Sequence, residues 1–333
     1  MAMKKLINQP EALVSELLEG FAIAHEKKVR MEGSNLVVRA HPKATDKVAL
    51  VTLGGSGHEP ALSGFVGEGM LDISVPGEIF AAPGPPRVLE ALRKANRDAG
   101  TLFVVLNHAG DVLSANLAMD MAKTEGLKVE SVLTHEDISG GPRNEPEERR
   151  GLVGCLPVIK VAGAAAEMGK SLEECKAIAE RMESNMATLA LAVSGATHPS
   201  TGGVIAEIPD DIMVVGMGQH GEAGGGTQSL KSADETTDIM LTALIDDLTL
   251  KSGDNVLVLI NGVGSTTLME LYIVLRRVKQ GLAEKNITLA RSLVGQYLTV
   301  QEMGGFQLCI ARMDEELLAL WDAPCDSPAL TVK

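Results

Sequence analysis

Short apolar segments that end in glycine or polar residues recur along the chain and predict buried β-strands. The first, residues 47–53, is rich in aliphatic side chains and stops at two glycines. Segments of this kind are typical of strands that are covered on both faces. The same pattern predicts further strands at 101–106, 127–133, 188–193, 211–217, 255–260, 289–294 and 306–311.

Helical periodicity fills several of the intervals between these strands. Apolar residues recur every three or four positions at 11–26, 112–125, 234–248 and 265–279. A longer Ala-rich stretch, 152–182, predicts two helices, because Gly169 interrupts it and Ser171 is a favoured N-cap for its second half. The alternation of strand, loop and helix indicates an α/β protein with mostly parallel or mixed sheets flanked by helices.

The length of the chain predicts two domains. Its 333 residues exceed the usual span of a single hydrophobic core. We expect an N-terminal α/β domain at 1–185 and a C-terminal α/β domain at 186–333, with the boundary just after the Ala-rich stretch. Two such domains leave room for a ligand cleft between them.

Composition and charge narrow the possible partners. Hydrophobic residues make up 45% of the chain but aromatic residues only 2%, so aliphatic side chains and Met must build the core. The net charge is −14, and no cluster of Lys and Arg interrupts it. A chain of this kind repels phosphate backbones and anionic lipids, so we expect neither nucleic-acid nor membrane binding. No signal peptide or membrane span is visible in the sequence.

The cysteines and histidines favour neither a metal site nor a disulfide framework. No C-x-x-C pair occurs among the four cysteines, and the histidines lack the spacing of metal ligands. We therefore expect no bound metal and a reducing, cytoplasmic location. The four cysteines are Cys155, Cys175, Cys309 and Cys325.

Three loops with polar or glycine residues follow predicted strands, at 54–60, 107–111 and 216–222. In open α/β sheets, ligands bind at the edge where the strands end. We expect the ligand site at these loops.

The first loop begins with Gly54, Gly55 and Ser56 and continues to His58. Small residues let backbone N–H groups approach a ligand closely, so all three are candidate substrate contacts. A tight turn with an ordinary polar histidine explains this loop equally well when it is taken alone.

One glycine pattern suggests a dinucleotide, and we consider it accidental. Gly216, Gly218 and Gly221 match G-x-G-x-x-G, the signature of a dinucleotide-dependent oxidoreductase. A dinucleotide site needs a helix directly after the glycines, and residues 222–228 cannot begin one. The sequence therefore contains no credible nucleotide site of its own.

Motifs spread over nearly the whole chain resemble the dihydroxyacetone-binding subunit family of dihydroxyacetone kinases. They are GGSGHEP at 54–60, PGEIF at 76–80, Gly-Asp at 110–111, G-x-H-G-E at 218–222 and LWDAP at 320–324. The resemblance implies a two-domain α/β fold, a homodimer, and phosphorylation of a short ketose.

The resemblance also implies roles for three residues. The histidine of the third loop, His220, would form a covalent hemiaminal with the ketose carbonyl, which a neutral imidazole can do and which excludes glycerol. Asp111 would accept the proton of the attacking hydroxyl, and His58 would hydrogen-bond the substrate near the reacting end. Two plainer interpretations stay open: Asp111 as the N-cap of the following helix, and His220 as a loop histidine bonded to backbone carbonyls.

The chain departs from the family pattern in the second loop. The family carries a lysine before the Asn of this loop and an aromatic residue after it, whereas this chain has Leu106 and His108. Leu106 makes that wall of the pocket apolar and is a candidate substrate contact. A larger ketose, such as erythrulose or apulose, is therefore an alternative to dihydroxyacetone.

The resemblance finally implies a partner subunit and a phosphoryl donor for this chain. The extra helical nucleotide domain of the single-chain family members is absent from this sequence. We therefore expect a separate helical subunit that holds ATP or ADP through Mg²⁺, with either ATP or a phosphotransferase-system protein as the phosphoryl donor. Some family members are instead non-catalytic co-activators that bind dihydroxyacetone, but the presence of Asp111 favours catalysis.

Overall fold

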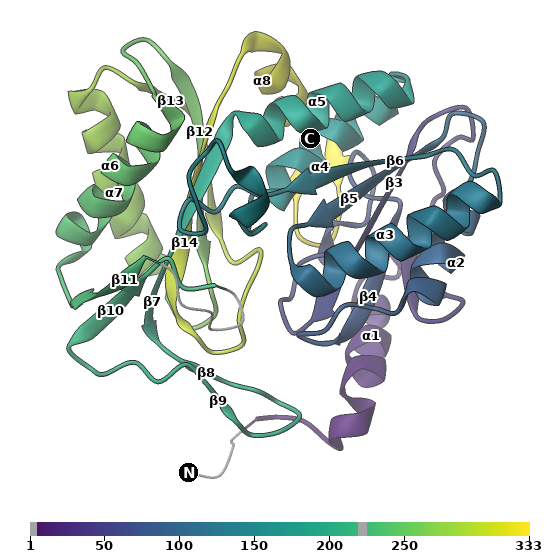
Figure 1. The fold of residues 1–333 in the computed structure, drawn as a ribbon, viewed down its shortest axis with the longest axis horizontal. Coiled ribbons are helices and arrows are strands. Elements are labelled where there is room, and N and C mark those ends of the chain that lie inside the picture. Colours follow the sequence, from purple (N-terminus) through teal and green to yellow (C-terminus); the bar gives the residue numbers. More distant parts are fainter. Residues whose placement is uncertain (1–4, 219–224) are drawn as a thin grey trace.

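The computed structural model describes residues 5–218 and 225–333, and most of its strands form two six-stranded sheets (Figure 1). The first sheet contains, in spatial order, β1 (Val29–Glu32), β2 (Leu36–Arg39), β4 (Ile73–Ile79), β3 (Ala49–Ser56), β5 (Thr101–Leu106) and β6 (Val129–Thr134). The second contains β11 (Gly226–Ser229), β10 (Ile212–Val215), β7 (Met186–Ser194), β14 (Gly304–Arg312), β12 (Asn255–Gly262) and β13 (Thr288–Gly295). Two small pairs are β8 (Ala196–Thr197) with β9 (Val204–Ile205), and β15 (Cys325–Asp326) with β16 (Thr331–Val332).

Helices precede, connect and follow these strands. They are α1 (Leu13–Ala24), α2 (Pro85–Ala95), α3 (Ala109–Thr124), α4 (Cys155–Glu167), α5 (Leu172–Ser184), α6 (Ala233–Leu248), α7 (Leu268–Glu284) and α8 (Glu315–Asp322). Short 3₁₀ turns occur at Pro10–Ala12, Ser63–Phe65 and Pro146–Glu148. Ser171 caps α5 in a reciprocal capping box with Glu174, so the predicted break in the Ala-rich stretch is confirmed.

The predicted α/β class with mostly parallel or mixed sheets is confirmed, but the two sheets differ in pairing. In the first sheet β4, β3, β5 and β6 pair in parallel, and β1 and β2 add an antiparallel edge. In the second sheet β12 and β13 pair in parallel across the α7 crossover, and the remaining neighbours pair antiparallel. Periodicity along the sequence did not predict β1, β2, β4, α2, β11 or α8.

The sheets and helices stack in five layers (Figure 1). Helices α2 and α3 cover the outer face of the first sheet, and α6 and α7 cover the outer face of the second. Helices α4 and α5 lie between the sheets, where they pack against both. Alternate residues of β5 follow this arrangement: Leu102 and Val104 face the central layer, and Phe103 faces α2 and α3.

Helix α4 is the centre of this stack, and its sequence explains how it fits there. Almost all of its side chains are buried, which is typical of a helix that is apolar around its whole circumference. A Cβ at Gly163 would lie 2.4 Å from the carbonyl oxygen of Gly69, so glycine allows the helix to approach that loop. The fully buried Lys160 donates to the carbonyl oxygens of Leu320 and Ala323 at 2.9 and 2.7 Å.

The two expected domains share this central layer. The first sheet is built from residues 29–134 and the second from 186–312, on either side of the expected boundary at 185/186. One hydrophobic cluster nevertheless joins α4 and α5 to both sheets. The last residues also return to the first half, since β15 forms a bridge at Asp326 with Glu68. The division at 185/186 stays a prediction.

All four cysteines are unpaired and buried. None of the helices within residues 5–218 and 225–333 is both long enough and apolar enough to span a bilayer.

A buried carboxyl group joins the first sheet to the central layer. Glu136 follows β6 and is 1% exposed. Its Oε1 accepts hydrogen bonds from the backbone N–H groups of Leu152 and Gly154, both at 2.8 Å, just before α4 begins. Burial raises the pKa of Glu136 to about 7.

This raised pKa predicts a pH-dependent stability. Between pH 4.5 and about 7 the unfolded chain loses the proton of Glu136 while the folded chain keeps it, so the free energy of unfolding falls as the pH rises. The loss amounts to about 3 kcal/mol. We expect Glu136→Gln to remove this slope in urea unfolding measured from pH 5 to 8, with Glu145→Gln on the exposed surface as the control for a lost charge. A constant difference between wild type and Glu136→Gln over this range would contradict the assignment.

Candidate functional site

A small cavity brings together five of the predicted site residues. Gly54, Gly55, His58, Leu106 and Asp111 all line it. They lie at the C-terminal ends of β3 and β5 and in the segments that follow them, as expected for two adjacent parallel strands that end at one edge of the first sheet. Phe80 after β4 and Leu298 after β13 also line this cavity.

The glycines at the start of the first loop leave no room for a side chain. A Cβ at Gly54 would lie 2.6 Å from Leu62 Cδ1, and one at Gly55 would lie 2.8 Å from the backbone nitrogen of Ala81. Gly57 has a φ of +101°, a conformation that strongly favours glycine. The loop can therefore pack tightly and present its backbone to the cavity.

His58 is held by a residue from the second half of the chain. Its Nδ1 lies 2.7 Å from the carbonyl oxygen of Thr299, in the loop 296–303 that joins β13 to β14. A carbonyl oxygen only accepts hydrogen bonds, so Nδ1 donates and carries the proton. Phe80 packs beside the His58 ring with a centroid distance of 4.9 Å. The cavity therefore depends on both sheets.

Further hydrogen bonds join the loop 296–303 to the first loop. The Thr299 N–H donates to the His58 carbonyl at 3.1 Å, and the Thr299 hydroxyl donates to the Glu59 carbonyl at 2.8 Å. Gln301 Nε2 donates to the Gly57 carbonyl at 3.0 Å. Three consecutive carbonyls of the first loop are thus bonded by one segment of the other half.

Asp111 lies in the first turn of α3, and its interpretation as the N-cap is wrong. The helix begins at Ala109, and His108 occupies the N-cap position. The sequence had placed the start of the helix at Val112, because the preceding Ala and Gly show no amphipathic pattern. A carboxylate in the first turn is favoured by the helix dipole, and in this position Asp111 lines the same cavity as His58.

The second loop differs from the family pattern at two positions with different surroundings. Leu106 is buried and lines the cavity, so an apolar side chain occupies the wall where the family carries lysine. His108 lies with Nε2 2.8 Å from the carbonyl oxygen of Gly151. Leu106 is therefore the departure that touches the site directly.

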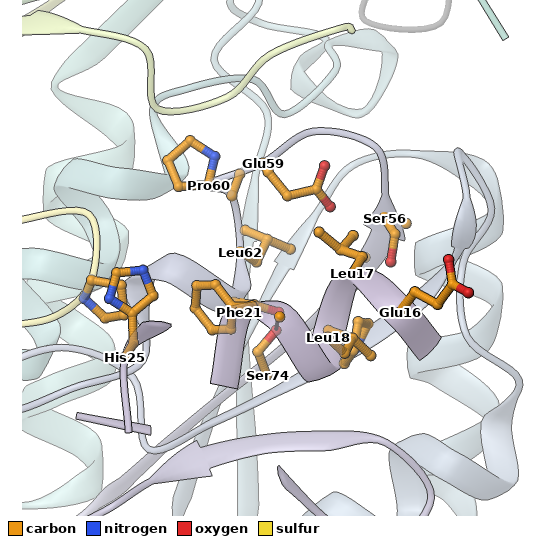
Figure 2. Close-up of a pocket in the computed structure, with 17 residues that line it drawn as sticks. Glu16, Leu17, Leu18, Phe21, His25, Ser56, Glu59, Pro60, Leu62 and Ser74 are labelled. Atoms are coloured by element: carbon orange, nitrogen blue, oxygen red, sulfur yellow. Dashed lines mark hydrogen bonds between the residues drawn. The ribbon is translucent and has the colours of Figure 1, made fainter. Parts of the chain in front are cut away.

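The side chain of Ser56 lines a different cavity. Its hydroxyl donates to the Gly77 carbonyl at 2.8 Å. The cavity that it lines, about 560 Å³ in volume, lies between the first loop and α1 (Figure 2). Gly54 and Gly55 line both cavities, and burial raises the pKa of Glu59 in the larger one. Substrate binding by Ser56 stays a prediction.

His220 lies outside the described residues, but the start of its loop is described. Gly216, directly after β10, has its carbonyl oxygen 2.9 Å from Arg150 Nη2, which donates to it, and 3.2 Å from Ser139 Oγ. Asp137, which is fully buried, accepts from both Arg150 and Ser139. This Arg150–Asp137–Ser139 network fixes the point from which the third loop departs.

Several residues of the candidate site were not predicted from the sequence. Thr299, Arg150 and Phe80 bear on the site through contacts that join distant parts of the chain. Phe80 is the last residue of the PGEIF motif at 76–80, so the sequence did point to this residue. Thr299 and Arg150 lay in segments without any motif.

Residues 19–329 match the model of the Dak1 domain. The chain belongs to the Dak1 domain family. The match extends over both sheets and the central helices, so the family resemblance stated from the motifs is confirmed.

Relatives of this Dak1 chain include stand-alone subunits and longer enzymes. It is 37% identical over 315 residues to the PTS-dependent dihydroxyacetone kinase 1, dihydroxyacetone-binding subunit DhaK, of Listeria innocua, covering 94% of this chain and 95% of the relative. It is 38% identical over 331 residues to the L-erythrulose kinase of Pectobacterium atrosepticum, covering 98% of this chain and 56% of that enzyme. The Dak1 chain thus spans nearly all of the first relative and little more than half of the second.

Solved structures share the fold of the Dak1 chain. The dihydroxyacetone kinase operon co-activator Dha-DhaQ superposes with a TM-score of 0.90 at 28% identity, covering 95% of this chain and 98% of that one. The dihydroxyacetone kinase from C. freundii in complex with AMP-PNP and Mg²⁺ superposes with a TM-score of 0.89 at 29% identity, covering 99% of this chain and 61% of that one. A kinase and a co-activator therefore share this fold, and fold alone does not distinguish them.

No group of three or more metal-ligating side chains lies together within the described part of the Dak1 chain. That the chain itself holds no metal stays a prediction.

The Arg150–Asp137–Ser139 network predicts an effect on the third loop. We expect Arg150→Gln to lower the yield of any His220-dependent ketose adduct about tenfold, because the Gly216 carbonyl loses its charged donor. Intact-protein mass spectrometry measures the yield. Arg276→Gln, which breaks an exposed pair with Asp234 far along the chain, controls for the loss of an arginine. Equal adduct yields in wild type and Arg150→Gln would contradict the positioning role of the network.

Proposed function

We propose that this chain is the ketose-binding subunit of a dihydroxyacetone-type kinase, acting as a phosphotransferase with an alcohol group as acceptor. The observation that carries the proposal is that His58 and Asp111 line one cavity together with the glycine backbone of the first loop. A histidine and a carboxylate that face one small site are suited to bind and deprotonate a hydroxyl group. Membership of the Dak1 family supports the same reaction.

The anchor in this proposal is His220. Its neutral imidazole nitrogen adds to the ketose carbonyl carbon, the carbonyl oxygen takes up a proton, and the ring loses one, so the hemiaminal is neutral overall. The covalent bond fixes a small substrate in one orientation, which lowers the entropic barrier to the next step. A polyol without a carbonyl group cannot be held in this way.

The transfer step then uses the other two residues. Asp111 accepts the proton of the primary hydroxyl as its oxygen attacks the terminal phosphorus of the donor, and His58 hydrogen-bonds the substrate near the reacting end. Gly54 and Gly55 contribute backbone contacts. Asp111 lies in the first turn of α3, two residues after the start of the helix. Helix capping therefore does not account for its presence.

The donor comes from outside this chain. We propose a separate helical subunit that carries ATP or ADP with Mg²⁺, as the stand-alone length of the Listeria relative and the AMP-PNP and Mg²⁺ of the longer C. freundii kinase suggest. A phosphotransferase-system protein is the proposed phosphoryl source, in line with the name of that relative, a PTS-dependent kinase subunit. We also propose a homodimer and a cytoplasmic location, the latter because all four cysteines are unpaired.

An exposed stripe on α3 is compatible with such a partner. Leu113, Leu117 and Met121 are 62%, 46% and 41% exposed, whereas the buried positions of the helix carry Ser or Ala. This is the reverse of an ordinary surface helix, which buries its large apolar side chains. The stripe begins two residues after Asp111 in the same helix.

Two substitutions separate anchoring from transfer. We expect His220→Ala to lose the ketose adduct and all transfer, and Asp111→Asn to keep the adduct but lower kcat by about 10²- to 10⁴-fold, because only proton acceptance is lost. Mass spectrometry after incubation with dihydroxyacetone measures the first, and ketose phosphorylation with the nucleotide-binding subunit from the same genome measures the second.

Each outcome assigns a function. An adduct without transfer in the wild type would identify a ligand-binding regulator like the co-activator of the same fold. Equal labelling of wild type and His220→Ala would contradict the hemiaminal.

A larger ketose is the second candidate substrate, and Leu106 is the observation that favours it. This buried apolar side chain lines the cavity beside Asp111. The Pectobacterium relative, named as an L-erythrulose kinase, shows that substrates differ within the family.

Leu106 therefore predicts a change in specificity. We expect Leu106→Lys to lower the ratio of kcat/KM for erythrulose to that for dihydroxyacetone about tenfold, because a cationic group replaces apolar contact with the longer substrate. Steady-state kinetics with both ketoses measures the ratio. An unchanged ratio would show that Leu106 does not shape specificity.

A further inference from the structure

Asn261, at the end of β12 in the second sheet, directs its side chain to the loop 296–303. The residue is fully buried. Its Nδ2 donates to the Leu298 carbonyl at 2.7 Å, and its Oδ1 accepts from the N–H groups of Tyr297 and Leu298 at 2.7 and 3.0 Å. A buried amide with these three bonds fixes the backbone around it, because any displacement leaves polar groups unsatisfied.

The backbone that Asn261 fixes leads directly to His58. Thr299 follows Leu298, and its carbonyl oxygen lies 2.7 Å from His58 Nδ1. The N–H of the same residue donates to the His58 carbonyl at 3.1 Å. The position of Thr299 therefore sets both the backbone and the ring of His58.

This contact also selects a tautomer. With the proton on Nδ1, the other nitrogen of a neutral His58 ring is an acceptor. His58 lines the cavity in which the ketose hydroxyl is proposed to react. The opposite tautomer would carry an N–H group on Nε2, which could donate a hydrogen bond to the bound ketose but could not accept one from its other hydroxyl groups.

We propose that Asn261 is a positioning residue for phosphoryl transfer, which acts through Thr299 to keep His58 in the Nδ1–H tautomer with Nε2 as an acceptor. The effect of Asn261 on phosphoryl transfer rests on the proposed function, whereas the tautomer of His58 does not. It makes a residue of the second sheet responsible for the chemical state of a residue on the first. Asn261 itself touches neither substrate nor reacting atoms.

The test uses Asn261→Ala in the full-length chain with its nucleotide-binding subunit. We expect kcat to fall about 10- to 100-fold, the range for lost outer-shell support, with KM for the ketose nearly unchanged, because the His220 anchor is separate from His58. In ¹⁵N-labelled protein, we expect His58 to change from the Nδ1–H form to a mixture of tautomers. Gln296→Ala, an exposed position in the same loop, is the control and should change neither quantity.

Several outcomes overturn the proposal. An unchanged His58 tautomer in folded Asn261→Ala, or a kcat loss that matches only the fraction of unfolded protein, would make Asn261 a purely structural residue. If Asn261→Ala does not fold, the wild-type spectrum decides, because a wild-type His58 protonated at Nε2 alone contradicts the geometry. Absence of both adduct and transfer in the wild type, with His58 in the Nδ1–H form, would refute the proposed function while leaving the tautomer assignment intact.

Discussion

The hydrogen bonds between the loop 296–303 and the first loop are the contact on which the candidate site depends. Thr299 and Gln301 together bond the carbonyl oxygens of Gly57, His58 and Glu59, and the Thr299 carbonyl accepts from the His58 ring. These bonds join Gly57, His58 and Glu59 to the second half of the chain, just beyond the part of the first loop that is held by strand pairing in β3. The site is thus a property of the interface between the two sheets.

The central helices make that interface rigid. Since α4 and α5 contribute to one hydrophobic cluster with both sheets, the loops at the sheet edges cannot shift independently of each other. Gly163 permits the close approach of α4 to the Gly69 segment, and Lys160 joins the same helix to the C-terminal end of α8. Burial of apolar surface between the layers therefore holds in place the polar contacts that define the cavity.

The sequence allowed much of this fold to be predicted, for reasons that are visible in particular elements. Buried strands such as β3 and β12 are continuous apolar runs, and Ser171 carries a cap signal that depends on neighbouring residues only. Strand β4 was missed because Pro76 and Gly77 interrupt its pattern, although it pairs with both β2 and β3. The start of α3 was placed three residues late because Ala109 and Gly110 carry no amphipathic signal.

The residues of the candidate site also divide into those that the sequence predicted and those that it did not. Gly54, Gly55, His58, Leu106 and Asp111 stand next to strand ends, so the rule that ligands bind at that edge predicted their meeting. Thr299 and Asn261 act through backbone contacts between segments some 240 and 40 positions apart in the chain, and such contacts leave no local pattern. The side chain of Ser56 lines the cavity beside α1 because successive residues of a strand face opposite sides.

The central claim is that a ketose is held between the loops of the two sheets by His220 and faces His58 and Asp111. A crystal structure of the chain soaked with dihydroxyacetone tests it most directly. The account predicts continuous electron density from the His220 ring to the ketose carbonyl carbon, with a hydroxyl of the adduct within hydrogen-bond distance of Asp111 and His58. Ketose bound without a covalent bond in the cavity beside α1, or density joined to another residue, would contradict it.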